Sequence, residues 1–139
     1  MSQENVEIVR RVLDARNERD MQAVLDYAAP DIEFDLSASP GPFAGVYRGH
    51  DELLRLWKAW SEVFSEMTWE AEEFVERGDA VVVPVRFHSR GRGSGVETTA
   101  RAVHVYWLRD GKVVRYRQCQ SWPEALEAVG PRTETPTRR

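Results

Sequence analysis

Two titratable residues stand where they could act on a proton: Asp35 in a short apolar strand pattern, and His104 in a second strand pattern far along the chain. A carboxylate inside an apolar pocket has its pKa raised by desolvation, and such a base can remove a proton next to a carbonyl group. A histidine, neutral or protonated, can donate a hydrogen bond to the enolate oxygen that forms. The pair therefore predicts proton transfer if both side chains reach one pocket, with Asp35 as the base and His104 supporting the oxyanion.

The direction of Asp35 is open from the sequence. Residues 31–36 alternate apolar and acidic side chains, with Glu33 and Asp35 in the same phase. The acidic side of this strand can equally enter a pocket or face water.

The direction of His104 depends on the turn at residues 110–111. A three-residue loop with Gly111 in the left-handed conformation predicts one shared strand face for His104, Tyr106, Tyr116 and Gln118. On that face Tyr106 and Gln118 would orient a substrate. A two-residue loop would instead place His104 beside Arg115 and Arg117. A half-buried histidine that serves only packing is the structural alternative.

Aromatic residues could line the walls of such a pocket: Tyr27, Trp57, Trp60 and Tyr116. Ordinary core packing is the competing explanation for tryptophans at helical spacing. The three histidines are too widely spaced for a recognisable metal motif, so no metal site is expected. The glycine-rich run at 91–95 lacks the Lys-Ser/Thr pair of a phosphate loop, and no cofactor is expected.

The elements that must position these residues follow from periodicity. Apolar residues at helical spacing predict helices over 5–17 and 51–64, with a short helix between them that is capped by Asp20 and ends before Pro30. Strand patterns cover 31–36, 67–72, 80–89, 96–108 and 112–120, and a helical turn covers 122–129. Helices first and strands afterwards predict an α+β domain over 1–131 with a curved antiparallel sheet. Residues 132–139 are expected to form a disordered tail.

Charge balance and cysteine count exclude several classes of protein. The net charge of −4 argues against a nucleic-acid partner, which requires a concentrated basic face. No apolar run approaches 18 residues, so no membrane span is expected. Cys119 is the single cysteine of the chain, which allows no internal disulfide and favours a reducing cytoplasm.

The order of these elements resembles the nuclear-transport-factor-2-like superfamily, and within it the SnoaL-like polyketide cyclases and the ketosteroid isomerases. The segments that carry the resemblance are VEIVRRVLDARNERDMQAVLDYAAPDIEFD, YRGHDELLRLW, HVYWLRDGKVVRYRQ and PEALEAVG. The resemblance implies a cone-shaped α+β barrel, three helices over a curved sheet, a pocket for a small apolar molecule, and a homodimer packed through the outer sheet face. It also implies that Asp35 takes the place of the isomerase base and His104 that of a pocket acid or histidine.

Two positions depart from the family pattern. Val12 stands near the place of the isomerase tyrosine, and Gln118 near that of the cyclase aspartate. The sequence therefore predicts binding of a polyketide- or steroid-like carbonyl compound, with cofactor-free isomerisation or aldol-type cyclisation as its chemistry. The alternative is a non-catalytic module for small-molecule binding or dimerisation.

Overall fold

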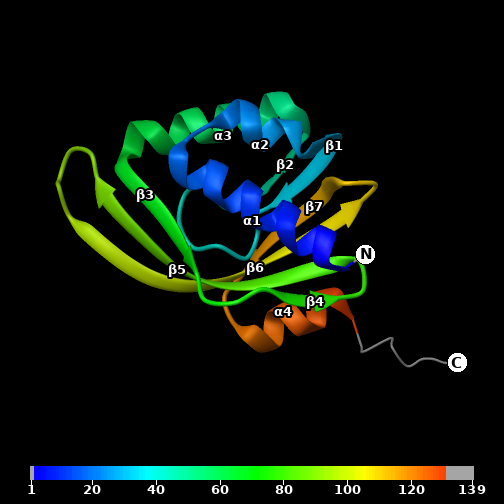
Figure 1. The fold of residues 1–139 in the computed structure, drawn as a ribbon. Helices are drawn as coiled ribbons and strands as arrows, with labels where there is room; N and C mark the ends of the chain where they lie inside the picture. The colour runs from blue at the N-terminus through cyan, green and yellow to red at the C-terminus, as the bar shows by residue number, and fades with distance from the viewer. Residues whose placement is uncertain (1, 131–139) are drawn as a thin grey trace, which may run out of the picture.

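The computed structural model describes residues 2–130, so the predicted tail at 132–139 lies outside the described residues. The chain forms four helices and seven strands in the described part, and the α+β class is confirmed (Figure 1). In chain order the elements are α1 (Ser2–Glu18), α2 (Met21–Asp26), β1 (Ala28–Asp35), β2 (Val46–Arg48), α3 (Gly49–Val63), β3 (Phe64–Ala71), β4 (Val75–Arg77), β5 (Ala80–Gly91), β6 (Glu97–Arg109), β7 (Lys112–Cys119) and α4 (Trp122–Val129).

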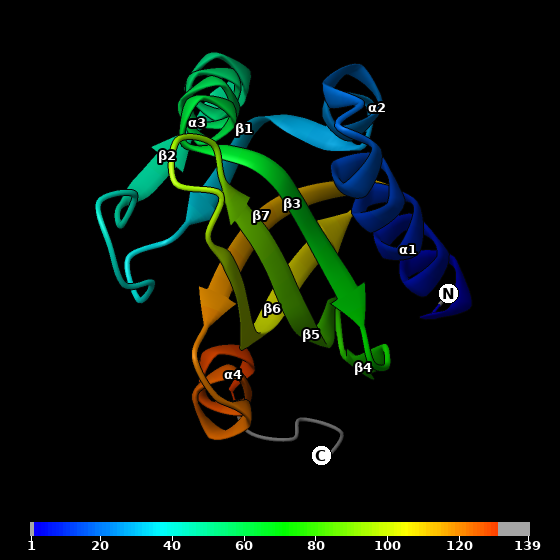
Figure 2. The ribbon, with the colours of Figure 1, turned by 90° about the vertical axis from the view of Figure 1, so that its left-hand side faces the viewer.

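The strands form one sheet in the order β2-β1-β7-β6-β5-β3, with β4 paired to β5. Neighbouring strands are antiparallel, except that β1 and β7 run parallel. The sheet is strongly curved and does not close into a barrel. Figure 2 shows α1, α2 and α3 on its concave side and α4 on the opposite side.

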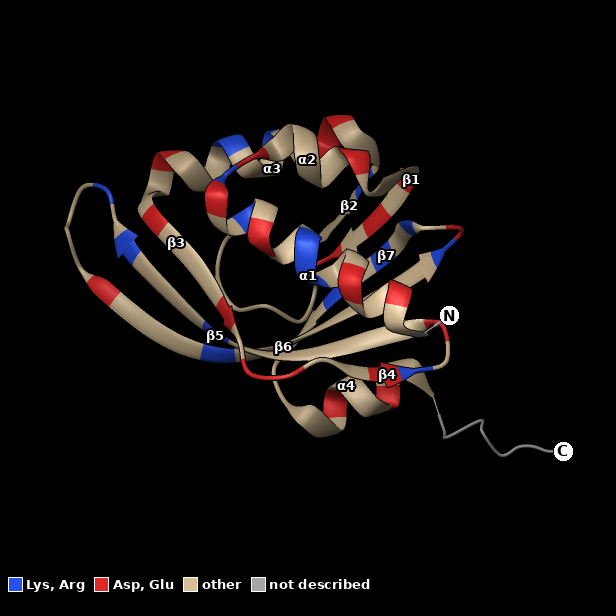
Figure 3. Ribbon diagram, in the orientation of Figure 1, with Lys and Arg blue, Asp and Glu red and all other residues tan. Residues whose placement is uncertain are grey.

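The helices lie on the concave face because each carries a buried stripe. In α1, Val9, Val12 and Leu13 are buried at helical spacing, and Arg16 continues the same stripe. In α3 the buried residues are Leu53, Leu56, Trp57 and Trp60. Charged residues of both signs alternate along the outer surfaces of the elements, and no described element is uniformly basic (Figure 3).

The β6–β7 register combines the two alternatives that the sequence left open. The turn has two residues, Asp110 and Gly111, which both adopt positive φ, so the three-residue loop is wrong. An extra residue in β7 then shifts the register between Trp107 and Leu108. As a result Tyr106 pairs with Tyr116 and His104 with Gln118, as predicted for the shared face.

Two predicted boundaries are wrong because strand pairing overrides local propensity. The second helix ends at Asp26 rather than near Pro30, since Ala28 already pairs with Val113 of β7. The segment over 37–49, to which the sequence assigned no helix or strand, contains β2, which pairs with β1, and the first residue of α3.

Two apolar cores lie on the two sides of the sheet. The main core fills the space between the concave face and the helices, and it includes Val81, Val83 and Val85. The smaller core lies between the convex face and α4, and it includes Val82, Val103, Val105, Cys119 and Ala125. Helix α4 covers Val103 and Val105, so this apolar face of β6 is buried within the described chain. None of the helices in residues 2–130 is both long and apolar enough to cross a membrane.

Candidate functional site

A cavity of about 370 Å³ opens between the concave sheet face, the C-terminal end of α3 and the loop over residues 36–45. This size falls in the range of ordinary small-molecule sites. Its walls are mainly apolar and aromatic, with a few polar side chains: Leu36, Ser39, Pro40, Phe43, Trp60, Phe64, Met67, Trp69, Phe87, Ser89, Thr98, Ala100, Arg101, Ala102, His104, Gln118 and Gln120.

His104 lies in the floor of this cavity and is fully buried. Its Nδ1 lies 3.4 Å from the Tyr106 hydroxyl, which itself accepts a hydrogen bond of 2.9 Å from Arg16 Nη1. Because that hydroxyl oxygen accepts from Arg16, its own proton is free to point at Nδ1, which leaves the imidazole hydrogen on Nε2. The Nε2 atom has no hydrogen-bond partner among the described residues.

The charge state of His104 follows from its surroundings. Burial, together with the nearby positive charge of Arg16, holds the pKa of His104 well below its ordinary value of 6.5. The side chain is therefore neutral at physiological pH. It is a hydrogen-bond donor through Nε2 rather than a cation or a ready base.

Arg16 is the second unusual group of the site, since only 1 % of it is exposed. Its guanidinium carbon lies 4.3 Å from the Trp69 ring centroid and 5.0 Å from that of Tyr116. The rings of Phe34 and Trp57 lie slightly farther away, at 5.6 and 5.8 Å. This aromatic cage stabilises the cation through the ring faces.

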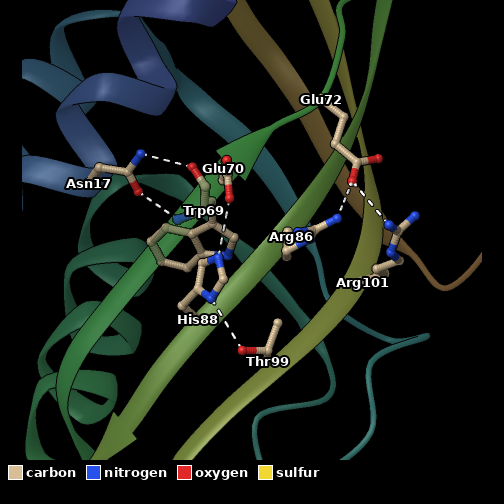
Figure 4. Close-up of polar contacts among 8 residues, drawn as sticks. All are labelled: Asn17, Trp69, Glu70, Glu72, Arg86, His88, Thr99 and Arg101. Atoms are coloured by element: carbon tan, nitrogen blue, oxygen red, sulfur yellow. Dashed lines mark hydrogen bonds and ion pairs between the residues drawn. The ribbon is translucent and has the colours of Figure 1, made fainter.

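The neighbouring residue Asn17 fixes α1 against the sheet. Its side-chain amide donates to the Trp69 carbonyl at 2.9 Å and accepts from the Trp69 backbone N–H at 2.8 Å (Figure 4). Since β3 is an edge strand, Asn17 takes the role of a strand partner there. This clamp sets the height of Arg16 above the sheet.

The convex face of β3, β5 and β6, behind the cavity, is polar and charged. Arg101 ion-pairs with Glu72 at 3.5 Å, and Arg86 approaches the same carboxylate oxygen at 3.4 Å. His88 lies between Glu70 and Thr99 on the convex side of the same strands (Figure 4). These exposed contacts contribute little stability each, but they hold β3, β5 and β6 in register behind the cavity.

The family model for the SnoaL-like domain matches residues 9–116. The chain belongs to the SnoaL-like domain family. A nuclear-transport-factor-2-like protein of unknown function from Burkholderia pseudomallei is 26% identical, with a TM-score of 0.77 over 92% of this chain and 98% of that one. A similar protein from Burkholderia xenovorans is 29% identical, with a TM-score of 0.73 over 94% and 98%.

TerC, whose structure contains polyporic acid, is 24% identical, with a TM-score of 0.76 over 92% of this chain and 99% of that one. At this identity the likeness shows the fold alone. No curated protein matches the chain. The predicted superfamily and its SnoaL-like branch are thus confirmed.

Asp35 is not brought together with His104 in this SnoaL-like domain. Phe34 stacks on Tyr116 at 4.2 Å on the concave face, so Asp35, the next residue, points to the convex face. There it accepts hydrogen bonds from the backbone and hydroxyl of Ser37, at 2.8 and 2.6 Å, and lies 3.9 Å from Arg115.

The expected rise in the pKa of Asp35 is wrong. Burial raises the pKa of this carboxyl, but the hydrogen bonds from Ser37 and the charges of Arg117 and Arg115 outweigh burial and lower the pKa below its ordinary value. Asp35 is therefore an ionised, structurally bound carboxylate on the far side of the sheet, and nothing in this geometry suits it to serve as a base in the cavity.

The other predicted site residues divide between two cavities. Trp60 and Gln118 line the large cavity with His104. Tyr106, Tyr116 and Trp57 instead line a cavity of about 20 Å³ behind it, which Arg16 also lines. Tyr27 lines neither; its hydroxyl lies on the outer surface and accepts from Arg11 at 3.4 Å.

Arg16 is the main residue that the sequence prediction missed as part of the site, although its position on the apolar stripe of the first helix was visible. A charged residue in such a stripe is the one signal that could have found it. For strand residues that line the cavity, such as Met67 and Trp69, the sequence pattern indicated only that their side chains are buried, not that they line a cavity. Burial raises the pKa of the Cys119 thiol to about 11, so the thiol stays protonated at physiological pH. No group of three metal-ligating side chains gathers within residues 2–130.

Proposed function

We propose that this SnoaL-like domain binds a flat, largely apolar carbonyl compound, polyketide- or steroid-like, with its carbonyl oxygen on His104. The observation that carries the proposal is the buried Nε2–H of His104, a donor with no partner among the described residues, in the floor of a mainly apolar cavity. A buried donor without a partner is costly, and an oxygen acceptor on a ligand removes that cost.

The neighbours of His104 support a ligand of this class. Trp60, Phe87 and Trp69 supply aromatic surface for a flat ring system. Gln118 pairs with His104 across the strands and can bond a second oxygen. Because the His104 ring is fully covered by its neighbours, a ligand oxygen reaches Nε2 only when the covering side chains shift slightly.

The test compares 9-fluorenone with fluorene, two flat ligands of the same shape that differ in one carbonyl group. Binding is followed by tryptophan fluorescence, since Trp60 and Trp69 line the cavity. We expect 9-fluorenone to bind more tightly by the value of one neutral hydrogen bond, about 0.5–1.5 kcal/mol or roughly twofold to tenfold. His104→Gln, which presents a different donor geometry, and His104→Phe, which has no donor, should reduce this preference.

Fluorene is the matched control, because its affinity depends on the apolar walls alone. We expect His104→Phe to leave fluorene binding nearly unchanged while it abolishes the preference for the ketone. Equal affinities for the two compounds in the wild type would contradict the role of His104. Failure of both compounds to bind would contradict the pocket itself.

Catalysis is the second candidate function, and the neutral imidazole favours it. A fixed Nε2–H donor stabilises an enolate oxygen, as needed in cofactor-free isomerisation or aldol-type cyclisation. No Asp or Glu is among the residues that line the cavity, so we assign the proton acceptor to solvent at the mouth rather than to Asp35. In this reaction His104 is the catalytic residue, and Gln118 orients the substrate.

A turnover screen of enolisable polycyclic ketones separates the two candidates. Exchange of the α-protons for deuterium, followed by NMR, reports enolisation even where no product forms. We expect faster exchange with the wild type than with His104→Phe at saturating ketone. Exchange at the buffer rate for every ketone that binds would leave binding as the function and exclude enolisation.

We also expect a homodimer, on the family resemblance alone. Sedimentation at micromolar concentration tests this, and a monomeric mass would contradict it.

A further inference from the structure

We infer that the ligand is bound as an anion: an enolic or phenolic carbonyl compound whose hydroxyl is ionised in the cavity, with the buried Arg16 supplying the opposite charge. This inference rests on the proposed function and specifies its ligand further. It would make the pocket a site for acidic enols and phenols rather than for neutral ketones in general.

The positive charge of Arg16 has no acidic partner among residues 2–130. A guanidinium remains protonated even when it is buried. Within residues 2–130 no carboxylate lies at ion-pairing distance from it, and its hydrogen-bond partner there is the neutral hydroxyl of Tyr106. Buried charges in proteins are normally paired, because removal from water is expensive. The charge therefore favours binding of an anion that the described part of the chain does not supply.

The unpartnered hydrogen-bond donors of Arg16 and its uncompensated charge are two separate features of this site. Arg16 Nε and Nη2 and the Tyr116 hydroxyl lack partners among the described residues. The two residues help to line the cavity of about 20 Å³, whose walls are almost entirely apolar and whose volume is enough for one water molecule. A water molecule would satisfy the donors of Arg16 but would leave its charge uncompensated. The aromatic cage offsets part of the charge, and an anionic ligand would offset the rest.

The walls of the large cavity allow an anion to enter. Among its lining residues the titratable groups are Arg101 and His104, and no acidic residue lines it. The Arg101 side chain lies on the convex face, where it pairs with Glu72 beside Arg86. A negative ligand thus meets no carboxylate in the cavity and a hydrogen-bond donor, His104, in its floor.

Tyr106 links the charge of Arg16 to the cavity floor. Arg16 Nη1 donates to the Tyr106 hydroxyl, and the hydroxyl lies beside Nδ1 of His104. Each donor in such a chain polarises the next, so the cation strengthens the Nε2–H of His104 as a donor. The gain is largest when the acceptor is an anion, because charge-assisted hydrogen bonds are about twice as strong as neutral ones.

The test uses 7-hydroxycoumarin, a flat carbonyl compound whose neutral and ionised forms absorb at different wavelengths. Its hydroxyl pKa is measured by titration, free and bound to the whole protein. We expect the bound pKa to fall by at least about one unit, which corresponds to tenfold tighter binding of the anion. 7-Methoxycoumarin, which cannot ionise, serves as the neutral probe of the pocket.

Three variants identify the source of the shift. Arg16→Met removes the buried charge at similar volume and should abolish most of the shift. Arg10→Met removes one charge from an exposed position of the same helix and should leave the shift intact. Tyr106→Phe keeps the charge but cuts the link to His104, so it should reduce the shift, and it serves if Arg16→Met fails to fold.

The outcomes separate this inference from the proposed function. If 7-methoxycoumarin binds but the pKa of bound 7-hydroxycoumarin is unchanged or raised, the anion inference is overturned and the pocket stands. A shift that Arg16→Met leaves at its full size also overturns it. If neither coumarin binds, both the proposed function and the inference fail.

Discussion

The neutral state of His104 makes the stability of the fold depend on pH in a defined direction. The folded state holds the pKa of His104 well below 6.5, because the ring is buried and lies near the positive charge of Arg16. In the unfolded chain the pKa returns to about 6.5. Below that pH, His104 binds a proton in the unfolded state but not in the folded state. The contribution to stability is therefore fully present above the unfolded pKa and is lost as the pH falls below it.

The size of this loss follows from linkage. If His104 stays neutral in the folded state, lowering the pH from about 7.5 to about 5 costs RT ln(1 + 10^1.5), or about 2 kcal/mol. His104→Gln has no such proton to take up, so the variant should lack this part of the loss. His50, His88 and the carboxylates are common to both proteins and cancel in the comparison.

Urea unfolding at a series of pH values measures the difference. With a slope of about 2 kcal/mol per molar urea, the wild-type midpoint should fall by about 1 M more than that of His104→Gln over this range. Parallel midpoints for the two proteins would show that His104 titrates normally in the folded state. That result would refute both its burial as a neutral group and the influence of Arg16.

Four further substitutions probe other contacts. Asn17→Ala removes both hydrogen bonds to the Trp69 backbone and should lower the free energy of unfolding by about 1–3 kcal/mol, as measured by urea unfolding. An unchanged free energy of unfolding would contradict the stabilising role of these two bonds. Asp35→Asn should leave affinity for 9-fluorenone unchanged, because the carboxylate faces the convex side; calorimetry that finds weaker binding would place Asp35 back in the pocket. Ala100 lines the cavity, so Ala100→Trp should place a large side chain in it and weaken ligand binding at least about tenfold by steric clash. Thr99→Trp, on the opposite strand face, should leave binding unchanged. Equal effects of the two substitutions would locate the ligand elsewhere.

The fold could be predicted from the sequence because its signals are local and repeated. The stripe of Val9, Val12 and Leu13 identified the first helix, and alternation identified the long strands. The partner of β1 could not be predicted, because its parallel pairing with β7 joins segments that lie far apart in the chain. The β6–β7 register depended on an extra residue in β7, which nothing in the turn sequence indicates.

The candidate site was predicted in part. His104 and Gln118 share the cavity wall as expected, because the register happens to restore their common face. Asp35 was placed in the pocket by the resemblance to the isomerases, although the alternation in its own strand equally allowed the convex face that it occupies. The role of Arg16 depends on four aromatic rings from distant segments, which only the folded chain brings together.

The arrangement of Arg16, Tyr106 and His104 has a simple physical consequence. Water screens a charge that is exposed to solvent. A charge buried among apolar side chains is screened much less, so it interacts more strongly with a ligand in the neighbouring pocket. The helix clamp of Asn17 keeps that charge at a fixed distance from the cavity floor. The pocket is thus prepared to bind an oxygen before any ligand arrives, which is the condition for strong electrostatic stabilisation.

A crystal structure of the protein soaked with 9-fluorenone tests most directly whether His104 anchors the ligand. We expect the ring system between Trp60 and Phe87, with the ketone oxygen at about 2.7–3.2 Å from Nε2 of His104. A ligand bound in this cavity with its oxygen turned to the mouth, or bound outside the cavity altogether, would contradict the central role given to His104.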